Sequence, residues 1–272
     1  MCRLYGFMAT EPTKVECTLV HSQNALMAQS RSDLKGYSHS HGWGLAAYQN
    51  HIPETERQAW AAYHGEHFQR AATKVYAHTV IAHVRRATVG GAKLENTHPF
   101  CDGRWVFAHN GTVPNFDQVR EKILLATAPE HRNQIKGETD SEHLFRYART
   151  LIDREEKPEI SRIVRKVVQD AESWALEIDP EARPGLNIIL SNGEELAGSR
   201  LGRSLVFVVR SGLYDCEICG FPHIHHDPSK DYKAIIIASE PLTHEKWTEV
   251  PERSIWKAEL EKPLLKITPL DP

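Results

Sequence analysis

The spacing of apolar and polar residues predicts strands at the start of the chain and helices in its middle. Residues 3–9 are apolar and rich in aromatic residues, so we predict a strand that begins at the N-terminus. Runs at 43–48, 80–84 and 105–108 are short and bounded by polar, glycine-containing segments, as buried strands are. Four segments have helical spacing: 18–29, 116–125, 140–152 and 159–178.

Runs of β-branched residues return in the last third of the chain, at 186–190, 201–209 and 234–238. Strands are therefore followed by helices and then by strands again. This order predicts layered α+β packing instead of a regular series of parallel βαβ units. With 272 residues, the chain has the length of one large domain or two small ones.

Composition narrows the range of partners and compartments. The net charge of -3 provides no general basic field, so we expect neither nucleic acid nor an anionic membrane as a partner. No apolar run approaches the ~18 residues of a membrane helix, and the N-terminus lacks the apolar core of a signal peptide. The five cysteines are an odd number, which favours a reducing compartment with free or metal-bound thiols. We therefore expect a cytoplasmic protein.

Cys2 has two interpretations. A cysteine at this position is usually a small residue near a frayed end. If Met1 is removed, however, Cys2 carries a thiol and an α-amine on the same residue. The α-amine has a reference pKa of about 7.7–8.0, so near neutral pH part of it is free to accept the thiol proton. A nucleophile and its base would then be present without a separate histidine.

Three further motifs fit the cleavage of an amide by such a thiol: HVRRATVG at 83–90, AHNG at 108–111 and GETDSE at 137–142. Attack on an amide forms a tetrahedral oxyanion, which needs donors that are already in place. Asn110 offers a side-chain amide and Gly111 an unobstructed backbone N–H. Singly, the Asn-Gly pair is more typical of a hairpin turn.

The other two motifs could hold the ends of a glutamine-like substrate. Arg85 is the natural bidentate partner of an α-carboxylate, and Asp140 is the natural partner of an α-ammonium. Singly, Arg85 is more often a surface charge and Asp140 a helix cap. Their occurrence together with the Asn-Gly pair, behind a cysteine at position 2, favours the functional interpretation.

These motifs identify a resemblance that extends over most of the chain. The sequence resembles the class II glutamine amidotransferases of the N-terminal nucleophile hydrolase superfamily, and within them the small stand-alone branch that includes γ-glutamyl hydrolases. The resemblance is carried by Cys2-Arg3-Leu4, His41-Gly42-Trp43-Gly44, RRAT, NTHPF (96–100), AHNG, GETDSE and ASEPLT (238–243).

The resemblance implies a single domain over residues 1–272, folded as a four-layer αββα sandwich. It also implies roles for individual residues. Cys2 matches the nucleophile, Asn110 and Gly111 match the oxyanion hole, and Arg85 and Asp140 match the clamps for the α-carboxylate and α-amine. Thr88 would lie beside the substrate pocket. No cofactor is expected for catalysis.

The sequence departs from many synthase-linked relatives at Arg86, where they have an aromatic residue, and at Val89, where they have a histidine. The pocket is therefore expected to be more open, or shaped for something other than free glutamine. We also see no second domain in the sequence to accept ammonia. Three functions follow: hydrolysis of a γ-glutamyl amide, delivery of ammonia to a separate synthase partner, or binding of γ-glutamyl ligands without turnover as a regulatory module.

The segment CEICGFPHIHH at 216–226 is a candidate metal site. Cys216 and Cys219 have the spacing of a thiolate knuckle, and His223, His225 or His226 could add ligands. The alternative is a turn with reduced thiols and exposed histidines. A zinc ion here would be structural, and redox use of the pair is not expected outside a βαβ context.

Overall fold

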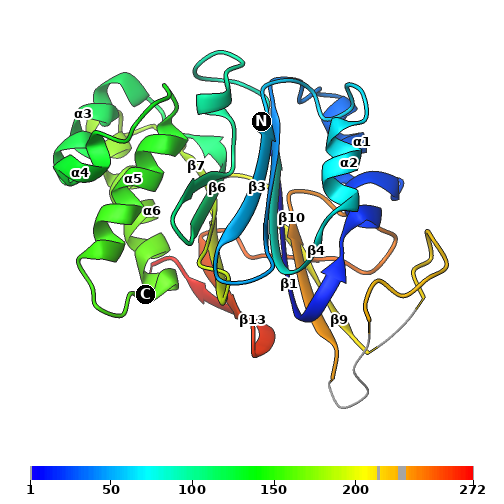
Figure 1. The fold of residues 1–272 in the computed structure, drawn as a ribbon. Coiled ribbons are helices and arrows are strands. Elements are labelled where there is room, and N and C mark those ends of the chain that lie inside the picture. The colour runs from blue at the N-terminus through cyan, green and yellow to red at the C-terminus, as the bar shows by residue number, and fades with distance from the viewer. Residues whose placement is uncertain (1, 213–214, 226–230, 272) are drawn as a thin grey trace.

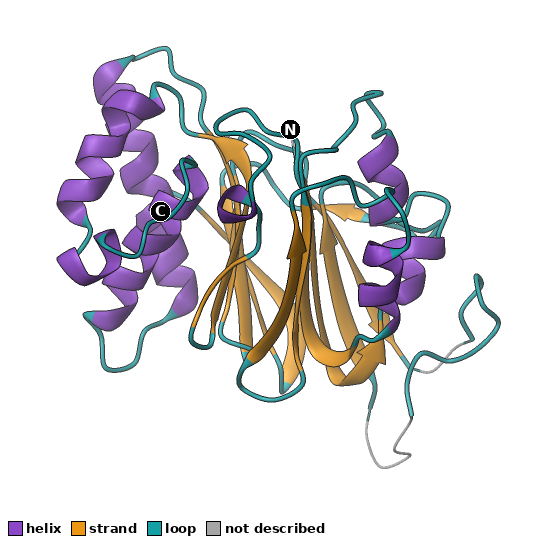
Figure 2. Cartoon of the chain, turned by 45° about the horizontal axis from the view of Figure 1, so that its top comes forward, coloured by secondary structure: helices purple, strands orange, loops and turns teal. Residues whose placement is uncertain are grey.

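The fold is a sandwich of two antiparallel sheets with helices on both outer faces (Figure 1). The computed structural model describes residues 2–212, 215–225 and 231–271. Figure 2 shows the four layers edge-on, with a group of helices on each side of the two sheets. The predicted αββα sandwich is therefore confirmed.

The first sheet has seven strands in the order β11-β9-β10-β1-β4-β2-β3 and the second has six in the order β13-β12-β8-β7-β6-β5. The strands of the first sheet are β1 (Arg3–Lys14), β2 (Trp43–Tyr48), β3 (Pro53–Gln58), β4 (Tyr76–Val84), β9 (Val206–Ser211), β10 (Lys233–Ala238) and β11 (Thr248–Glu249). Those of the second are β5 (Phe100–Asp102), β6 (Trp105–Thr112), β7 (Gly185–Ser191), β8 (Glu195–Arg200), β12 (Ser254–Glu259) and β13 (Lys262–Pro269).

The helices form two groups that cover opposite sheets. The group on the seven-stranded sheet consists of the π-helix η1 (Cys17–His21), α1 (Leu26–Arg31) and α2 (His67–Thr73). The group on the six-stranded sheet consists of α3 (Phe116–Ala126), α4 (Pro129–Arg132), α5 (Asp140–Asp153) and α6 (Ile160–Ile178). A short 3-10 helix, η2 (Leu94–Asn96), lies in the connection between β4 and β5.

Strand β1 is buried on both faces and forms the centre of the seven-stranded sheet, between β10 and β4. Because successive side chains of a strand point to opposite faces, Leu4 and Met8 enter the core between the two sheets. Tyr5 and Phe7 enter the core beneath the first group of helices. The rigid, central position of β1 fixes the place of Cys2, which immediately precedes it.

Several segments differ from the sequence prediction. The helix predicted at 18–29 is wrong as a single element, because the chain breaks into η1 and α1 around an extended Ser22. The strand predicted at 201–209 begins only at Val206, and Gly202, with φ +76°, lies in a turn before it. The polar edge strand β3 was not predicted at all, since its side chains do not alternate between apolar and polar.

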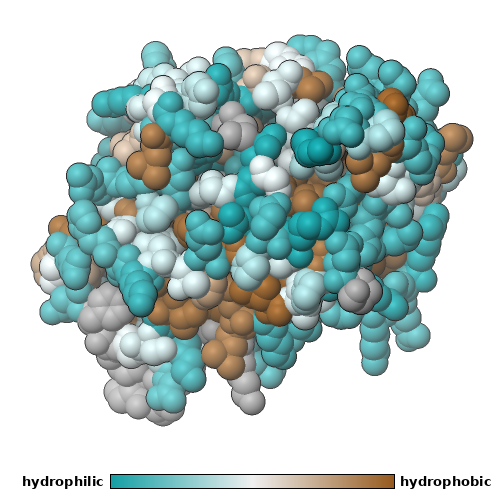
Figure 3. Space-filling view, turned by 180° about the vertical axis from the view of Figure 1, so that it is seen from behind, coloured by the Kyte–Doolittle hydropathy of each residue, from teal (hydrophilic) through white to brown (hydrophobic). Residues whose placement is uncertain are grey.

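The face seen from behind is mostly hydrophilic, and apolar side chains gather in a band across its lower middle, between hydrophilic side chains (Figure 3). Among the described residues, we find no helix with the length and apolar character needed to cross a bilayer.

Candidate active site

Cys2 lies at the N-terminal end of β1, against the segment that follows β4. Its Sγ is 3.4 Å from the backbone nitrogen of Arg86, which donates to it, and 3.5 Å from the Arg86 carbonyl. Burial raises the pKa of the Cys2 thiol, and the Asp140 carboxylate adds to this rise. The Arg86 hydrogen bond and the Arg85 charge lower the same pKa. The thiol is thus within electrostatic reach of both predicted substrate clamps.

A buried ion-pair network holds the N-terminal end of β1 in place. The Arg3 guanidinium pairs with Asp33 and, at 2.6 Å, with Glu240, and it also donates to the Cys2 carbonyl at 2.9 Å. His39 Nε2 lies 3.0 Å from the same Asp33 oxygen that Arg3 contacts. Sequence reasoning did not assign these roles. The available signal was an arginine at the start of an apolar strand, since a buried charge requires partners.

Arg85 and Asp140 are both buried, so neither is a simple surface charge. The Arg85 guanidinium donates to the carbonyls of Val89 at 2.7 Å and Gly91 at 2.8 Å. Asp140 begins α5, and its carboxylate accepts from the backbone nitrogen of Val113 at 2.8 Å. The side chain that caps α5 is Thr139, not Asp140. Backbone contacts therefore orient both charges.

Asn110 and Gly111 lie within β6, so the hairpin-turn interpretation of this pair is wrong. Asn110 Nδ2 donates to Ser239 Oγ at 3.2 Å, whereas Asn110 Oδ1 is buried without a partner. A Cβ on Gly111 would approach the Gly185 carbonyl oxygen to 1.7 Å, so only glycine fits here. Ser239 was not assigned a role from the sequence.

The segment after β4 is supported by neighbouring side chains. His41 Nδ1 accepts a hydrogen bond from the backbone nitrogen of Ala87 at 3.0 Å, so His41 stabilises this segment. Thr88 is exposed, and its Oγ1 lies 3.3 Å from Thr112 Oγ1 at the end of β6. The guanidinium of Arg86 stacks over Tyr37, 4.0 Å from the ring centroid. The side chain of Arg86 therefore packs on an exposed aromatic ring.

A cavity of about 460 Å³ borders the loop that Arg85 holds. Its lining includes charged side chains of both signs, and consists of Val89, Gly90, Gly91, Lys93, Phe116, Asp117, Arg120, Gly137 and Glu138. Val89 also packs against the core under α3 and α5. Cys2, Arg85 and Asp140 are not among the residues that line this cavity.

A cluster of three thiols and one imidazole lies on the helical side of the seven-stranded sheet. The ligand atoms of Cys17, Cys216, Cys219 and His223 are all within 4.8 Å of one another, so this group could hold a metal ion. The three residues predicted from the sequence are brought together, and Cys17 was missed. His225 instead contacts Tyr76, and His226 lies outside the described residues.

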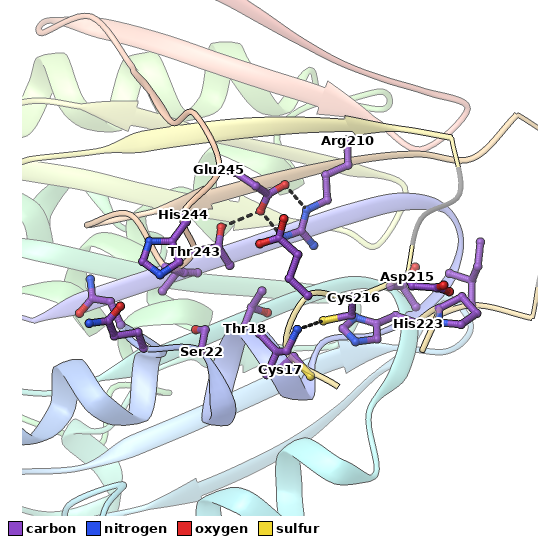
Figure 4. A pocket seen from close by; sticks show the side chains of 18 of the residues that line it. Cys17, Thr18, Ser22, Arg210, Asp215, Cys216, His223, Thr243, His244 and Glu245 are labelled. Carbon is purple, nitrogen blue, oxygen red and sulfur yellow. Dashed lines mark hydrogen bonds and ion pairs between the residues drawn. The ribbon is translucent and has the colours of Figure 1, made fainter. Parts of the chain in front are cut away.

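A cavity of about 700 Å³ adjoins this cluster (Figure 4). Cys17, Cys216 and His223 lie at one end of it, while Arg210 and Glu245 form an ion pair across from them. This cavity does not include Cys2 or any of the residues predicted to bind the substrate.

Comparison with known proteins places these features in a family. The family model of class II glutamine amidotransferases matches residues 1–260. The chain is 26% identical to "Probable glutamine amidotransferase DUG3" of Saccharomyces cerevisiae, over 94% of this chain and 81% of that protein. It is 24% identical to the "Gamma-glutamyl-hercynylcysteine sulfoxide hydrolase" of Mycobacterium tuberculosis, over 100% of this chain and 97% of the other.

Solved structures agree in fold. A class II glutamine aminotransferase domain protein from Silicibacter pomeroyi superposes with a TM-score of 0.65 at 18% identity, and each chain is covered completely. The glutamine phosphoribosylpyrophosphate amidotransferase of B. subtilis superposes with a TM-score of 0.63 at 17% identity, over 99% of this chain and 49% of that one. From the match of its family model, this chain belongs to the class II glutamine amidotransferases.

Proposed function

We propose that this protein hydrolyses the γ-amide of glutamine or of a γ-glutamyl compound, with Cys2 as its N-terminal nucleophile after removal of Met1. The observation that carries the proposal is the position of Cys2, whose Sγ accepts from the backbone nitrogen of Arg86 at 3.4 Å, directly after the buried Arg85. Burial raises the pKa of the thiol, the Arg85 charge lowers it and the Asp140 carboxylate raises it, so both charges act on Cys2. A zwitterionic amino-acid end beside a scissile amide is the substrate chemistry that this arrangement fits.

The first step is proton transfer within Cys2. Because burial raises the pKa of the thiol, the resting group is protonated and needs a base. The freed α-amine, with a reference pKa of about 7.7–8.0, can take that proton near neutral pH. The sulfur then attacks the γ-carbonyl carbon, and the carbonyl oxygen becomes an oxyanion.

Asn110 and Gly111 would stabilise that oxyanion. The unpartnered Oδ1 of Asn110 suggests how its amide is oriented for this task. If the carboxamide turns over, Oδ1 accepts the hydroxyl proton of Ser239, and Nδ2 is released to donate to the oxyanion. Ser239 Oγ can meanwhile keep the hydrogen bond from the Leu4 nitrogen, at 2.9 Å. Ser239 is then a positioning residue that joins the oxyanion hole to β1.

Arg85 and Asp140 would hold the α-carboxylate and the α-ammonium of the substrate. Thr88 would contribute at the edge of the same pocket. Collapse of the oxyanion breaks the carbon–nitrogen bond, and the leaving ammonia or amine takes the proton from the α-amine. Water then adds to the γ-glutamyl thioester, its proton returns to sulfur, and glutamate is released.

We favour a hydrolase of γ-glutamyl compounds over a subunit that donates ammonia to a synthase. The hydrolase relative from M. tuberculosis aligns over 100% of this chain and 97% of its own length. Arg86, whose backbone contacts Cys2, stacks on the exposed Tyr37, and this pair would offer a planar, cationic surface to a larger leaving group. Ammonia would need no such surface.

We further infer that residues 1–272 act as one domain, and that catalysis needs no cofactor. A nucleophilic thiol must stay reduced, which favours a cytoplasmic setting. We also propose that Cys216, Cys219 and His223 bind a structural zinc ion, because a thiolate knuckle with an imidazole suits this metal.

The test is glutamate release by untagged protein whose intact mass shows that Met1 is absent. Glutamine and a panel of γ-glutamyl amides should be compared at equal concentration. Faster glutamate release from a γ-glutamyl amide than from glutamine supports a hydrolase. Activity that rises sharply only when a synthase is added identifies an ammonia donor instead. Binding without turnover by the processed protein would contradict the proposal and leave the regulatory alternative.

A further inference from the structure

We propose that Cys17 is the fourth ligand of a closed zinc site, and that the ion fastens η1 to the connection between β9 and β10. This inference rests on the structural zinc proposed above and adds a ligand and a purpose. Cys17 is the first residue of η1, whereas the other three side chains come from the 215–225 segment. The juxtaposition therefore joins two parts of the chain that are far apart in sequence.

The cluster has the dimensions of a tetrahedral site. With metal–sulfur distances of about 2.3 Å, the ligand atoms of a tetrahedral zinc ion are separated by roughly 3.8 Å. The four ligand atoms here lie within 4.8 Å of one another, and Cys219 Sγ is 3.3 Å from His223 Nε2. A cation at the centre thus requires only small side-chain adjustments.

The backbone of the knuckle is already folded around the sulfur of Cys216. The nitrogen of Ile218 donates to Cys216 Sγ at 3.4 Å, and the nitrogen of Gly220 donates to the Cys216 carbonyl at 2.8 Å. Gly220 has a φ of +74°, which favours glycine at this turn. Backbone N–H groups directed at ligand sulfurs are the outer-shell contacts that orient a metal site.

Four protein ligands leave no open position for water or substrate, so the ion would be structural. Its place in the fold agrees with this role. Cys17 follows the C-terminal end of β1, whereas Cys2 precedes the N-terminal end. Cys17, Cys216 and His223 also line the 700 Å³ cavity, so the ion would form part of its wall (Figure 4).

Other contacts already hold the 215–225 segment against neighbouring strands. The nitrogen of Lys14 donates to the His223 carbonyl at 2.9 Å, and the nitrogen of His225 donates to the Tyr76 hydroxyl at 3.2 Å. These bonds bring the 215–225 segment to β1 and β4 without a metal. The ion would then lock a contact that the chain already forms, so its loss should lower stability without unfolding the protein.

The first measurement is the metal content of full-length protein purified without chelator or metal-affinity resin. We expect close to one zinc ion per chain, and an intact mass that indicates reduced thiols. Protein without zinc, or with the mass deficit of a disulfide, would overturn both this inference and the proposed zinc site. Neither outcome would bear on hydrolysis at Cys2, which is measured separately.

The second measurement compares Cys17→Ser with Cys101→Ser, a matched control whose thiol lies on β5 outside the cluster. Cys17→Ser should lose most of its zinc and melt several degrees lower, while the control keeps both properties. Full zinc content in Cys17→Ser would leave a three-ligand site and overturn the role of Cys17.

A third measurement does not depend on any variant. Cobalt(II) in place of zinc in the wild-type protein gives thiolate-to-metal charge-transfer absorption whose intensity grows with the number of thiolates. We expect the charge-transfer intensity of three thiolates in a tetrahedral site. The intensity of two thiolates, or an octahedral spectrum, would contradict it even if Cys17→Ser failed to fold.

Discussion

One cysteine lies before β1 and another lies after it, and the two have different chemical surroundings. Cys2, at one end, accepts a hydrogen bond from the Arg86 backbone nitrogen, and the opposite charges of Arg85 and Asp140 act on its thiol. Cys17, beyond the other end, faces two more thiols and an imidazole. The first setting leaves one sulfur able to react with a substrate, whereas the second offers four ligands to a single cation.

The comparison shows that the neighbouring groups determine whether a thiol acts as a nucleophile or as a metal ligand. A nucleophile needs an accessible position and donors aimed at the charge that develops in the reaction. A structural metal site needs complete ligation and no vacancy. Strand β1 lies between the two sites, so a change at one site should not affect the other. The independence of the two sites can be tested.

The largest expected effect is at Cys2. In Cys2→Ala, kcat for glutamate release should fall by at least about 10⁴-fold, because no other group can form the thioester. Metal content should be unchanged. Cys101→Ala is the matched control and should retain activity. Residual thiol-dependent turnover in Cys2→Ala would show that another cysteine is the nucleophile.

The buried network at Arg3 should have the next largest effect, on stability. Arg3→Met leaves Asp33 and Glu240 buried without their cation, which should lower the free energy of unfolding by about 3–5 kcal/mol. Denaturant titration measures the change. The control is Arg70→Met, whose exposed partner Glu66 lies one helical turn away, and where we expect a change below about 0.5 kcal/mol. Equal effects would mean that the Arg3 network does not anchor Cys2.

The oxyanion donor is the next feature to test. Asn110→Ala should lower kcat by about 10²–10³-fold with little change in KM, since the donor acts on the transition state. Ser239→Ala should lower kcat less, and Ser239→Thr should restore it if the hydroxyl positions the amide. A change confined to KM would contradict the assigned role.

The charge clamp at Arg85 should act mainly on binding. Arg85→Lys replaces a planar, bidentate donor with a point charge, so KM should rise by roughly 10- to 100-fold. An analogue without the α-carboxylate should lose this dependence on Arg85. If the variant affects both compounds equally, Arg85 supports the loop through Val89 and Gly91 and does not bind the carboxylate.

The pH dependence gives the smallest effect. Only the neutral α-amine can accept the thiol proton, so kcat/KM should rise about tenfold per pH unit below roughly pH 8 and then level off. A rise centred near pH 6.5 would indicate a histidine as base. His39 would not produce that rise, because burial lowers its pKa to about 4.

Much of the fold could be predicted because each element carries its own pattern. The apolar run at 43–48 became β2 with the same bounds, and the stripe at 140–152 became α5. The break at Ser22 could not be seen, since both flanking segments are apolar and the break depends on packing against β1. Local periodicity does not contain that tertiary information.

The candidate site also contains some residues that could be predicted from the sequence and others that could not. Cys2, Arg85, Asn110 and Asp140 stand in motifs whose chemistry can be recognised within a few residues. The partners of Arg3, Asp33 and Glu240, lie far from it in sequence. The role of Ser239 depends on its contacts with Leu4 of β1 and Asn110 of β6. Cys17 lacks a local motif altogether. Only the fold brings such residues to their partners.

The most direct test of the central claim is covalent trapping with an electrophilic ketone analogue of glutamine. Native protein without Met1 should gain one adduct per chain, and peptide mapping should place that adduct on Cys2. Protein engineered to retain Met1 should react much more slowly, because its Cys2 nitrogen is an amide and cannot serve as base. Labelling of another residue, or equal labelling of both forms, would contradict catalysis by an N-terminal cysteine.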